Sequence, residues 1–397
     1  MKNTITYLKC WQNNGKKVAI YCAGRHGLLF SEILKRCGVR IDVFFDSSSV
    51  KWGEEIDDGV YCANPRQIVD KERYMVFICI DPRYYEQVRN TVCKAGYENI
   101  VDFNAVLDDV IMNHRRLYCN LIRQYQSIPA AEVFYTPFGR QKALWDGCGA
   151  ARQAERIAVY TGIFGDYDEL CEPAVIPPNV DYYFLSDVKP ERESVFKWID
   201  AKTVIPAEVT SPVKRNRYIK MHPHLLFPDY KYSVYIDGNI YVKGDITSFV
   251  RENPSGITVF MHPKRDCIFY EAVTIVNFQR VAAEDVCRQM EKYLDEGMPL
   301  HYGMPEMPVI AREHHKPACR RIMEDWWKEF DMGAQRDQLS FMYAVWKNGM
   351  TIRDISSLGS DVRKDKRLKF RDHSHENRRV FNDKICRTSE KTGYASD

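Results

Sequence analysis

The most informative stretch of the sequence is Lys231-Tyr-Ser-Val-Tyr-Ile-Asp237-Gly-Asn239-Ile-Tyr-Val. Its first half alternates aromatic and β-branched residues, which predicts a strand. A strand that ends in Asp-x-Asn presents two oxygen ligands at the edge of a sheet, an arrangement that suits Mg²⁺ or Mn²⁺ beside a nucleotide diphosphate. Asp-Gly-Asn is also good turn chemistry, so a plain hairpin turn remains an alternative for this segment alone.

Composition indicates an ordinary globular protein. The chain has 397 residues, enough for two or three domains, with 45% hydrophobic and 28% charged residues. The net charge is 57 − 54 = +3, too small to suggest a nucleic-acid partner. We expect no transmembrane helix, because no apolar run reaches the required length, and the N-terminus lacks the apolar core of a signal peptide.

Thirteen cysteines are scattered along the chain without a Cys-x-x-Cys pair. An odd, dispersed set with no secretory signal is typical of reduced thiols, and it predicts a cytoplasmic location. Most of these cysteines are expected to be small core residues.

Residues 1–103 are predicted to form a small Rossmann-like domain. Strand and helix patterns alternate through it, as a βαβ unit requires. The glycine turn at 23–27 departs from the dinucleotide fingerprint, because Cys22 stands where the first Gly belongs. Asp46 lies at a spacing that could meet a ribose hydroxyl. A docking unit that binds no nucleotide is the alternative.

The flanking segments are assigned from their patterns. Residues 104–127 have the spacing of one helix, and 104–155 is predicted to be a helical connector and linker. Residues 361–397 are predicted to form a basic tail, with eight Lys/Arg against four Asp/Glu between 361 and 379. Such a tail could contact an anionic membrane at its inner face, or it could be simply solvated.

Residues 156–360 are predicted to form a second α/β domain whose polar residues follow strands. In an open α/β sheet the ligand crevice lies at the carboxyl ends of the strands. The residues at such ends are Thr161, Asp187, Asp237, Asn239, His262 and His314.

Seven ordered blocks carry a resemblance over about residues 157–350. They are Tyr160–Tyr167, Phe184–Asp187, His224–Pro228, Tyr232–Asn239, His262–Glu271, Ala311–His314 and Arg336–Phe341. This order resembles the domain-of-unknown-function 616 family, which in turn is similar to glycosyltransferase family 8. The resemblance implies a GT-A fold, a nucleotide-sugar donor and a divalent metal. The chain departs from family 8 at Asn239, where that family has Asp, and it lacks the segment His-x-Gly-x-x-Lys-Pro-Trp.

The expected metal ligands follow from the strand ends and from this resemblance. Asp237 would hold Mn²⁺ or Mg²⁺ through a carboxylate oxygen, and Asn239 could add a carbonyl oxygen or meet the ribose. His262 or His314 would complete the shell, although lone histidines are more often structural.

The donor is expected to contact five further residues. Arg217 and Lys220 lie one helical turn apart, so they share a face that could meet the diphosphate, with solvated side chains as the commoner outcome. Arg265 is expected to neutralise phosphate. Thr161 and Asp187 fit contacts to the uracil and ribose of UDP.

Three residues are expected to act on the sugars. The resemblance to family 8 implies that Asp337 hydrogen-bonds sugar hydroxyls and that Gln338 lies near the reacting carbon. Asp337 is also a good helix cap. Glu271 would bind the acceptor or brace Arg265. Of the adjacent Trp326 and Trp327, one is expected in the core, and the other could stack on an acceptor sugar.

Together these expectations describe a metal-assisted, retaining glycosyltransferase. It would move a sugar from a UDP-sugar to a polysaccharide or glycolipid acceptor. A metal-dependent hydrolase acting on a lipid or sugar remains an alternative, because the same Asp and His residues could activate water. A non-catalytic nucleotide-sugar binder is the third reading, which Asn239 keeps open.

Overall fold

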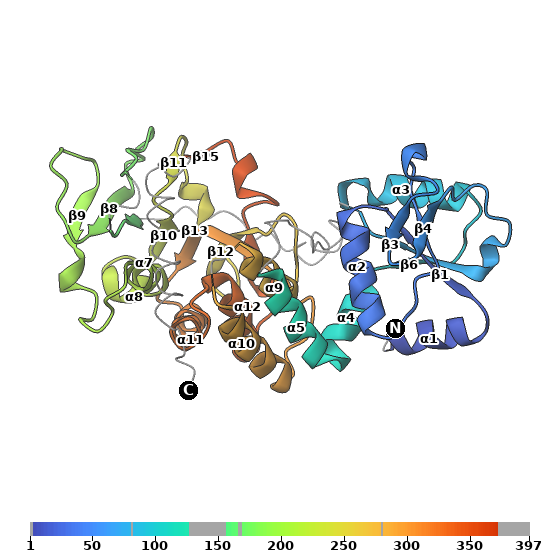
Figure 1. The fold of residues 1–397 in the computed structure, drawn as a ribbon. Coiled ribbons are helices and arrows are strands. Elements are labelled where there is room, and N and C mark those ends of the chain that lie inside the picture. The colour runs from blue at the N-terminus through green and yellow to red at the C-terminus, as the bar shows by residue number, and fades with distance from the viewer. Residues whose placement is uncertain (1–2, 81, 127–155, 166–168, 279–280, 372–397) are drawn as a thin grey trace, which may run out of the picture. The chain divides into compact units, whose positions relative to one another are not determined.

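The structure, a computed structural model, describes residues 3–80, 82–126, 156–165, 169–278 and 281–371. The chain divides into two compact units. The first unit comprises Met1–Phe138 and Phe269–Leu300, and the second comprises Gly139–Ile268 and His301–Asp397. Figure 1 colours both units along the chain.

The first unit contains a six-stranded sheet in the order β3-β4-β2-β1-β5-β6. Its strands are β1 (Lys17–Tyr21), β2 (Val43–Phe45), β3 (Glu55–Asp57), β4 (Val60–Ala63), β5 (Tyr74–Ile78) and β6 (Ile100–Asp102). All neighbouring strands pair in parallel except β3 with β4. The helices that accompany them are α1 (Thr4–Asn13), α2 (Arg25–Arg36) and α3 (Pro82–Lys94). The predicted βαβ pattern is therefore present, whereas a nucleotide-binding role for it stays a prediction.

Asp46 holds the turn between β1 and α2 together. Its carboxylate accepts hydrogen bonds from the backbone of Ala23 at 3.0 Å and of Ser48 at 3.0 Å, and from Lys51 Nζ at 2.8 Å. Burial alone raises the pKa of Asp46, but the bonds from Lys51, Ser48 and Ala23 outweigh it and lower that pKa. The carboxylate expected to meet a ribose is thus engaged within the protein.

Gly27 is expected to tolerate no side chain. An added Cβ would lie 1.9 Å from the backbone oxygen of Cys22, a residue already at a φ of 111°. Gly27→Ala should therefore lower the free energy of unfolding by roughly 3 kcal/mol, because backbone must move. Gly24→Ala is the matched control, since its Cβ would meet the Cys22 sulfur at 3.6 Å and Lys51 Nζ at 4.0 Å, both ordinary contact distances. Urea unfolding measures both, and equal losses would contradict the expectation.

The predicted helix over 104–127 is two helices within the described residues. They are α4 (Asn104–Asn113) and α5 (Arg115–Tyr125), and they break at His114, whose ψ of 53° is not helical. Helix α10 (Ala283–Asp295) packs against α5, and Arg123 pairs with Glu284 at 2.6 Å.

Residues 269–300 therefore lie with the first unit, whereas the sequence pattern predicts them within the second domain. Helix α9 (Ile268–Asn277) precedes α10 in this segment. The predicted linker at 128–155 lies outside the described residues.

The second unit contains a seven-stranded mixed sheet in the order β14-β12-β13-β10-β7-β8-β9. The strands are β7 (Ile157–Gly162), β8 (Val180–Ser186), β9 (Lys197–Asp200), β10 (Tyr232–Ile236), β12 (Ile257–Met261), β13 (Pro305–Glu313) and β14 (Ser356–Ser357). Only β13 runs antiparallel to its neighbours. The carboxyl ends of β7, β8, β10 and β12 therefore share one edge with the amino end of β13 (Figure 1). We call this the carboxyl edge.

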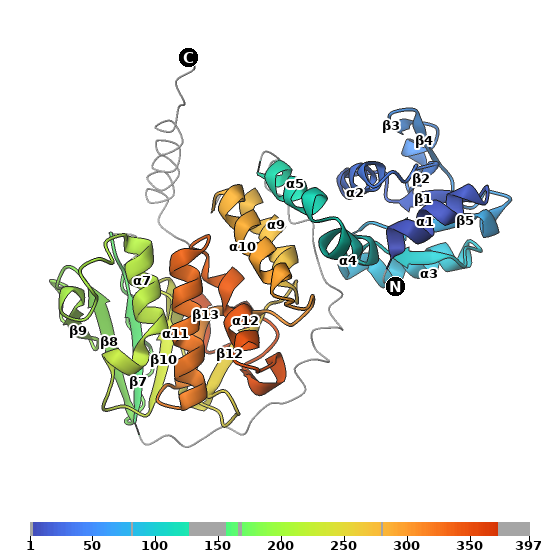
Figure 2. The ribbon, with the colours of Figure 1, turned by 90° about the horizontal axis from the view of Figure 1, so that it is seen from below.

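Helices cover one face of this sheet. They are α7 (Pro212–Met221), α8 (Pro223–Leu226), α11 (Pro317–Met332) and α12 (Asp337–Lys347). Helix α11 lies between α7 and α12 and contacts both (Figure 2). We call this side the helix face.

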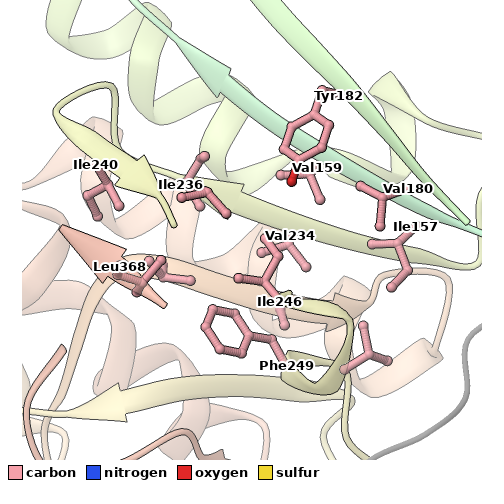
Figure 3. Packing of buried hydrophobic residues seen from close by; sticks show 14 of the residues in the cluster. Ile157, Val159, Val180, Tyr182, Val234, Ile236, Ile240, Ile246, Phe249 and Leu368 are labelled. Atoms are coloured by element: carbon pink, nitrogen blue, oxygen red, sulfur yellow. The ribbon is translucent and has the colours of Figure 1, made fainter. Parts of the chain in front are cut away.

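The opposite face packs a hydrophobic core (Figure 3). Alternate positions of the strands, such as Val159 and Val234, point into it. They meet Phe249 and Leu368 from segments outside the sheet. Because side chains alternate along a strand, the residues between them face the helices.

Residues 361–371 belong to the fold rather than to a solvated tail. Strand β15 (Leu368–Phe370) pairs antiparallel with β11 (Ile240–Val242), and Val362 and Leu368 are buried. The boundary predicted at residue 360 is therefore too early. The rest of the predicted basic tail, 372–397, lies outside the described residues.

Short 3₁₀ helices complete the described secondary structure. They are Ser49–Lys51, Lys71–Arg73, Ala201–Thr203, Thr247–Phe249, Ile352–Asp354 and Val362–Lys364. Among the described residues, no helix has both the length and the apolarity that crossing a bilayer requires.

Candidate functional site

Asp237 stands at the carboxyl edge, directly after β10. Its backbone nitrogen donates to the oxygen of Pro308 at 2.8 Å, which fixes it beside the start of β13. Tyr235 lies two residues earlier, so both side chains point to the helix face. The Tyr235 hydroxyl donates to Asp237 Oδ1 at 2.9 Å. Burial, followed by the charge of Asp237, raises the pKa of Tyr235 well above its usual value.

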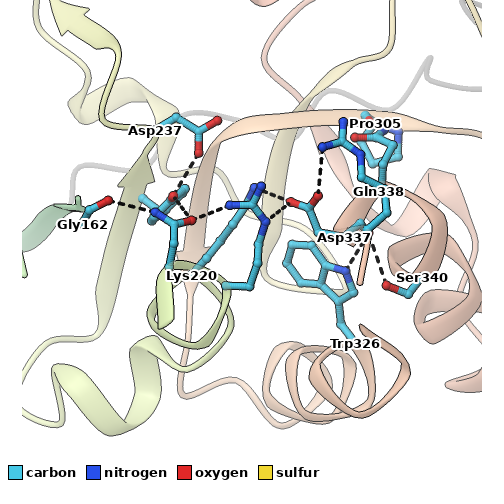
Figure 4. A network of polar contacts seen from close by, with 12 residues as sticks. Gly162, Lys220, Asp237, Pro305, Trp326, Asp337, Gln338 and Ser340 are labelled. Atoms are coloured by element: carbon cyan, nitrogen blue, oxygen red, sulfur yellow. Dashed lines mark hydrogen bonds and ion pairs between the residues drawn. The ribbon is translucent and has the colours of Figure 1, made fainter. Parts of the chain in front are cut away.

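Asp337 lies at the centre of a cluster of cations. Its Oδ2 is 3.0 Å from Arg217 Nε and 2.8 Å from Lys220 Nζ, and its Oδ1 is 3.9 Å from Arg336 (Figure 4). Arg217 and Lys220 share a face of α7, as their spacing predicts. The Asp337 side chain is only 6% exposed. We call these four residues the ionic cluster.

Burial and charge oppose each other in the ionic cluster. Burial alone would raise the pKa of Asp337, but Arg217, Lys220 and Arg336 outweigh it and hold that pKa well below its usual range. Burial likewise lowers the pKa of Lys220, against the attraction of Asp337 and Asp237. Asp237 therefore acts on the same lysine as Asp337, and the two carboxylates belong to one electrostatic site.

Asn216 connects this site to β7. Its Nδ2 donates to the Gly162 oxygen at 2.8 Å, and its Oδ1 lies 3.2 Å from the Tyr235 hydroxyl. Helix α7 is set in place by its first turn, where Ser211 Oγ accepts from the Lys214 backbone at 3.1 Å. This cap fixes how α7 presents its polar face to the sheet.

Gln338 follows Asp337 at the start of α12. Its Nε2 donates to the oxygen of Pro305, the first residue of β13. The backbone oxygen of Asp337 accepts from Trp326 Nε1 at 2.9 Å. Gln338 is thereby held at the carboxyl edge. The helix cap itself is Arg336, one residue before the predicted position.

The strand ends of β7 and β8 supply two more of the expected residues. Thr161 is buried, and its hydroxyl has no hydrogen-bond partner within the described residues. Asp187 forms an ion pair with Arg215 at 2.6 Å, and the Arg215 guanidinium lies 5.6 Å from the centre of the Phe164 ring. Residues 166–168, which belong to the first sequence block, lie outside the described residues.

His262 lies at the carboxyl edge, but it does not have the form of a metal ligand. Its Nδ1 accepts from the backbone nitrogens of Lys264 at 3.2 Å and Arg265 at 3.0 Å. Burial, and then Arg265 and Lys264, lower its pKa well below the usual value, so the ring is neutral. A neutral ring whose Nδ1 accepts carries its proton on Nε2, which leaves no lone pair for a metal. The Arg265 side chain is also buried.

His314 is on the wrong edge for the predicted metal site. It follows β13, which runs antiparallel to β10 and places Glu313 opposite Tyr232, at the start of β10. Asp237 lies at the other end, five residues along a strand that rises about 3.3 Å per residue. His314 Nε2 instead contacts the Phe227 oxygen at 3.1 Å. The assignment of His314 to the same site as Asp237 is wrong.

The remaining metal donors are few. Asn239 is bound to the end of β15, where its backbone oxygen accepts from the Arg371 nitrogen at 2.8 Å. Within the described ranges, no group of three His, Cys, Asp or Glu residues could hold a metal ion. One carboxylate, Asp237, and one amide suit Mg²⁺ or Mn²⁺ only where substrate phosphates complete the shell.

Two other expectations concern Glu271 and the adjacent tryptophans. Glu271 lies on α9 in the first unit and is buried, so its catalytic role stays a prediction. Trp326 is the predicted core tryptophan, whereas Trp327 is partly exposed and meets Tyr218 and His222 at steep ring angles, so its stacking on an acceptor sugar stays a prediction.

Sequence reasoning missed Asn216, Tyr235 and Arg336. Tyr235 had a signal, because it shares a strand face with Asp237 at a spacing of two. Arg336 precedes Asp337 and Asn216 precedes Arg217 in the sequence, but no sequence pattern indicates that Arg336 and Asn216 take part in the site.

Buried histidines predict a loss of stability in acid. Burial, helped by His222, lowers the pKa of His224 to about 4, and burial, helped by His315, lowers that of His314 to about 3. Both rings ordinarily titrate near 6.5. The unfolded chain therefore takes up protons first, so stability is complete above pH 6.5 and falls as the pH decreases toward 4.

Urea unfolding at pH 7, 6 and 5 would measure this loss. Most carboxylates titrate below this window, so they contribute little to the slope. His224→Gln should flatten the dependence, because glutamine does not titrate. A stability that stays constant from pH 7 to 5 would contradict the expectation.

The mixed sheet, with its helix face and its polar carboxyl edge, has the features of an α/β glycosyltransferase-like domain. The comparison of families agrees with this class. The chain belongs to the family described as TOD1/MUCI70, glycosyltransferase-like domain, which matches residues 148–359.

Two individual proteins are similar to the chain. The probable hexosyltransferase MUCI70 of Arabidopsis thaliana is 26% identical over an alignment of 220 residues that covers 48% of this chain. The match spans 37% of that relative, little more than a third of its length. The apo structure of the bifunctional glycosyltransferase WbbM aligns with a TM-score of 0.31 and 11% identity, over 52% of this chain and 39% of the other.

Proposed function

We propose that the second unit transfers a sugar from a nucleotide-diphosphate donor, UDP-sugar being the expected one. The observation that carries this proposal is the carboxyl edge, where Asp237 and the ionic cluster adjoin each other on the helix face. Ligands of open α/β sheets bind at such edges.

The ionic cluster supplies positive charge for the leaving group. Arg217, Lys220 and Arg336 surround the single carboxylate of Asp337. Breaking the bond to the anomeric carbon develops negative charge on the diphosphate, and cations fixed beforehand stabilise that charge without reorganising. The excess of cations over carboxylates in the cluster is therefore suited to a departing diphosphate.

A divalent metal fits the proposal if the protein supplies only Asp237 and Asn239 as its ligands. Asp237 would hold it, with Asn239 as a further oxygen donor. Bound there, Mn²⁺ or Mg²⁺ would supply additional positive charge to the diphosphate. We propose that the donor's own phosphates complete its coordination, since the described residues offer so few ligands.

The strand ends of β7 and β8 are the proposed site of the nucleoside. The unpartnered Thr161 hydroxyl could bond to the base or ribose. Arg215, held by Asp187 near the buried ring of Phe164, places a fixed positive charge in this region.

The position of the donor sugar is proposed from Asp337 and Gln338. Gln338 is fixed against Pro305 at the carboxyl edge, so its amide would lie near the sugar, while the backbone at Asp337 is fixed by Trp326. We propose a retaining transfer to a saccharide or glycolipid acceptor. The described cysteines form no disulfide, which accords with a reducing, cytoplasmic setting, beside a membrane if the acceptor is a lipid.

Turnover tests the proposal. The full chain is incubated with a panel of nucleotide sugars and saccharide or glycolipid acceptors, with Mn²⁺ and with EDTA, and the released nucleotide is measured. We expect release from one class of donor, reduced by EDTA. Cleavage of a saccharide or lipid without any donor would instead support a hydrolase, and tight UDP binding without turnover would support a non-catalytic binder.

A further inference from the structure

A basic hollow lies on the surface of the first unit. Its lining residues are Arg66, Lys71, Thr91, Lys94 and Ala95. Its volume is about 440 Å³, within the roughly 300–1,000 Å³ typical of small-molecule sites. It therefore has room for a ligand larger than water. We call it the basic hollow.

Two segments bring the cations together. Arg66 and Lys71 lie between β4 and β5, whereas Thr91 and Lys94 lie in the last turns of α3. The side chain of Lys71 crosses the end of α3, since a Cβ on Gly96 would lie 3.8 Å from Lys71 Nζ. Thr91 Oγ1 donates its proton to the Gln87 backbone oxygen at 3.0 Å. The hydroxyl oxygen can therefore still accept a hydrogen bond, but its proton is already used within the helix.

Among the residues that the structure describes, these cations have no carboxylate partner. Within the described ranges, Arg66, Lys71 and Lys94 form no ion pair, whereas nearby Arg73 pairs with Asp70 at 3.8 Å. The carboxyl end of α3 carries only about half an elementary negative charge. That charge offsets a small part of three cations, so the basic hollow retains a positive potential that attracts an anion.

We propose that the basic hollow binds a phosphate-bearing ligand. Arg66 can bond to two phosphate oxygens at once, and the two lysines add point charges. A soluble phosphorylated compound and the headgroup of an anionic lipid share this chemistry. Val69 lies two residues before Lys71 in the chain and is 88% exposed, so an apolar side chain close in sequence to the hollow is available to contact the surface of a bilayer.

The experiment uses two probes on the full chain. Inorganic pyrophosphate is titrated by calorimetry in the presence of saturating UDP, which occupies the donor site proposed above. Co-sedimentation is measured with phosphatidylcholine vesicles with and without phosphatidic acid. The test variant is Arg66→Gln with Lys94→Gln. The control is Arg89→Gln with Arg116→Gln, which removes the same charge from exposed positions of the first unit outside the hollow.

We expect the test variant to weaken binding at least about tenfold and the control to leave it nearly unchanged. If the unmodified protein co-sediments with vesicles that contain phosphatidic acid and the test variant does not, the hollow binds a lipid headgroup. Pyrophosphate binding without vesicle binding would assign it to a soluble compound. Equal binding by both variants, or no binding of either probe, would overturn the proposal. UDP binding should be the same in both variants, so a failure of the donor site would be seen separately.

Discussion

Replacing Asp337 with Asn is expected to lower the free energy of unfolding by about 3–5 kcal/mol. The carboxylate is buried and lies within 3.0 Å of Arg217 and Lys220. Asparagine keeps the shape but removes the charge, so the cations around it are left buried and uncompensated. Glycosyl transfer should be lost as well, because Arg217 and Lys220 would no longer be held at the carboxyl edge. Urea unfolding measures the first effect, and donor turnover the second.

Asp331→Asn is the matched control for this variant. Asp331 pairs with Lys214 at 2.7 Å, but its side chain is 41% exposed. Water and salt screen such a pair, so its loss should cost less than about 1 kcal/mol. If the two variants were equally stable, the ionic cluster would not have the energetic role that its burial implies.

Asp237→Asn is expected to reduce kcat/KM for the donor at least about 100-fold. The charge is lost, whereas the amide oxygen can still accept from the Tyr235 hydroxyl. Stability should therefore change by less than about 1 kcal/mol. The variant separates chemistry from folding, because Asp337 still compensates Arg217 and Lys220 when the charge of Asp237 is removed.

The control here is Asp245→Asn, which removes the same charge from the loop after β11. Asp245 is exposed, and its Oδ1 accepts from the Thr247 backbone at 2.8 Å. It should retain nearly full turnover. Normal activity in Asp237→Asn would remove Asp237 from the mechanism, and equal losses in the two variants would mean that the effect is not specific to the carboxyl edge.

The sequence predicted the position of the carboxyl edge because strand ends are local features. Alternation in 232–236 marked β10, and Asp237 follows it at the edge where other parallel strands end. The spacing of Arg217 and Lys220 predicted a shared face, and both contact one carboxylate. Patterns of this kind depend only on residues that are close in the sequence, so they can be predicted without coordinates.

The direction of β13 could not be read in the same way. A strand pattern is the same whether the strand runs parallel or antiparallel, so His314 was placed at the carboxyl edge although it follows the other end. Strand direction depends on pairing between distant segments, and no local residue determines it.

The ion-pair partners of the charged residues could not be predicted from the sequence either. Asp337 was expected to contact sugar hydroxyls, yet its carboxylate is engaged by Arg217 and Lys220, which lie 120 and 117 residues away in the chain. The grouping of 269–300 with the first unit likewise depends on the packing of α10 against α5. Contacts over such separations follow from the whole fold.

A crystal structure of the full chain with UDP and Mn²⁺ tests the central claim most directly. We predict density for the diphosphate at the end of β10, with Asp237 on one side and Arg217 and Lys220 on the other. Nucleotide density elsewhere on the protein, with the carboxyl edge of the second unit left empty at saturating UDP, would contradict the account.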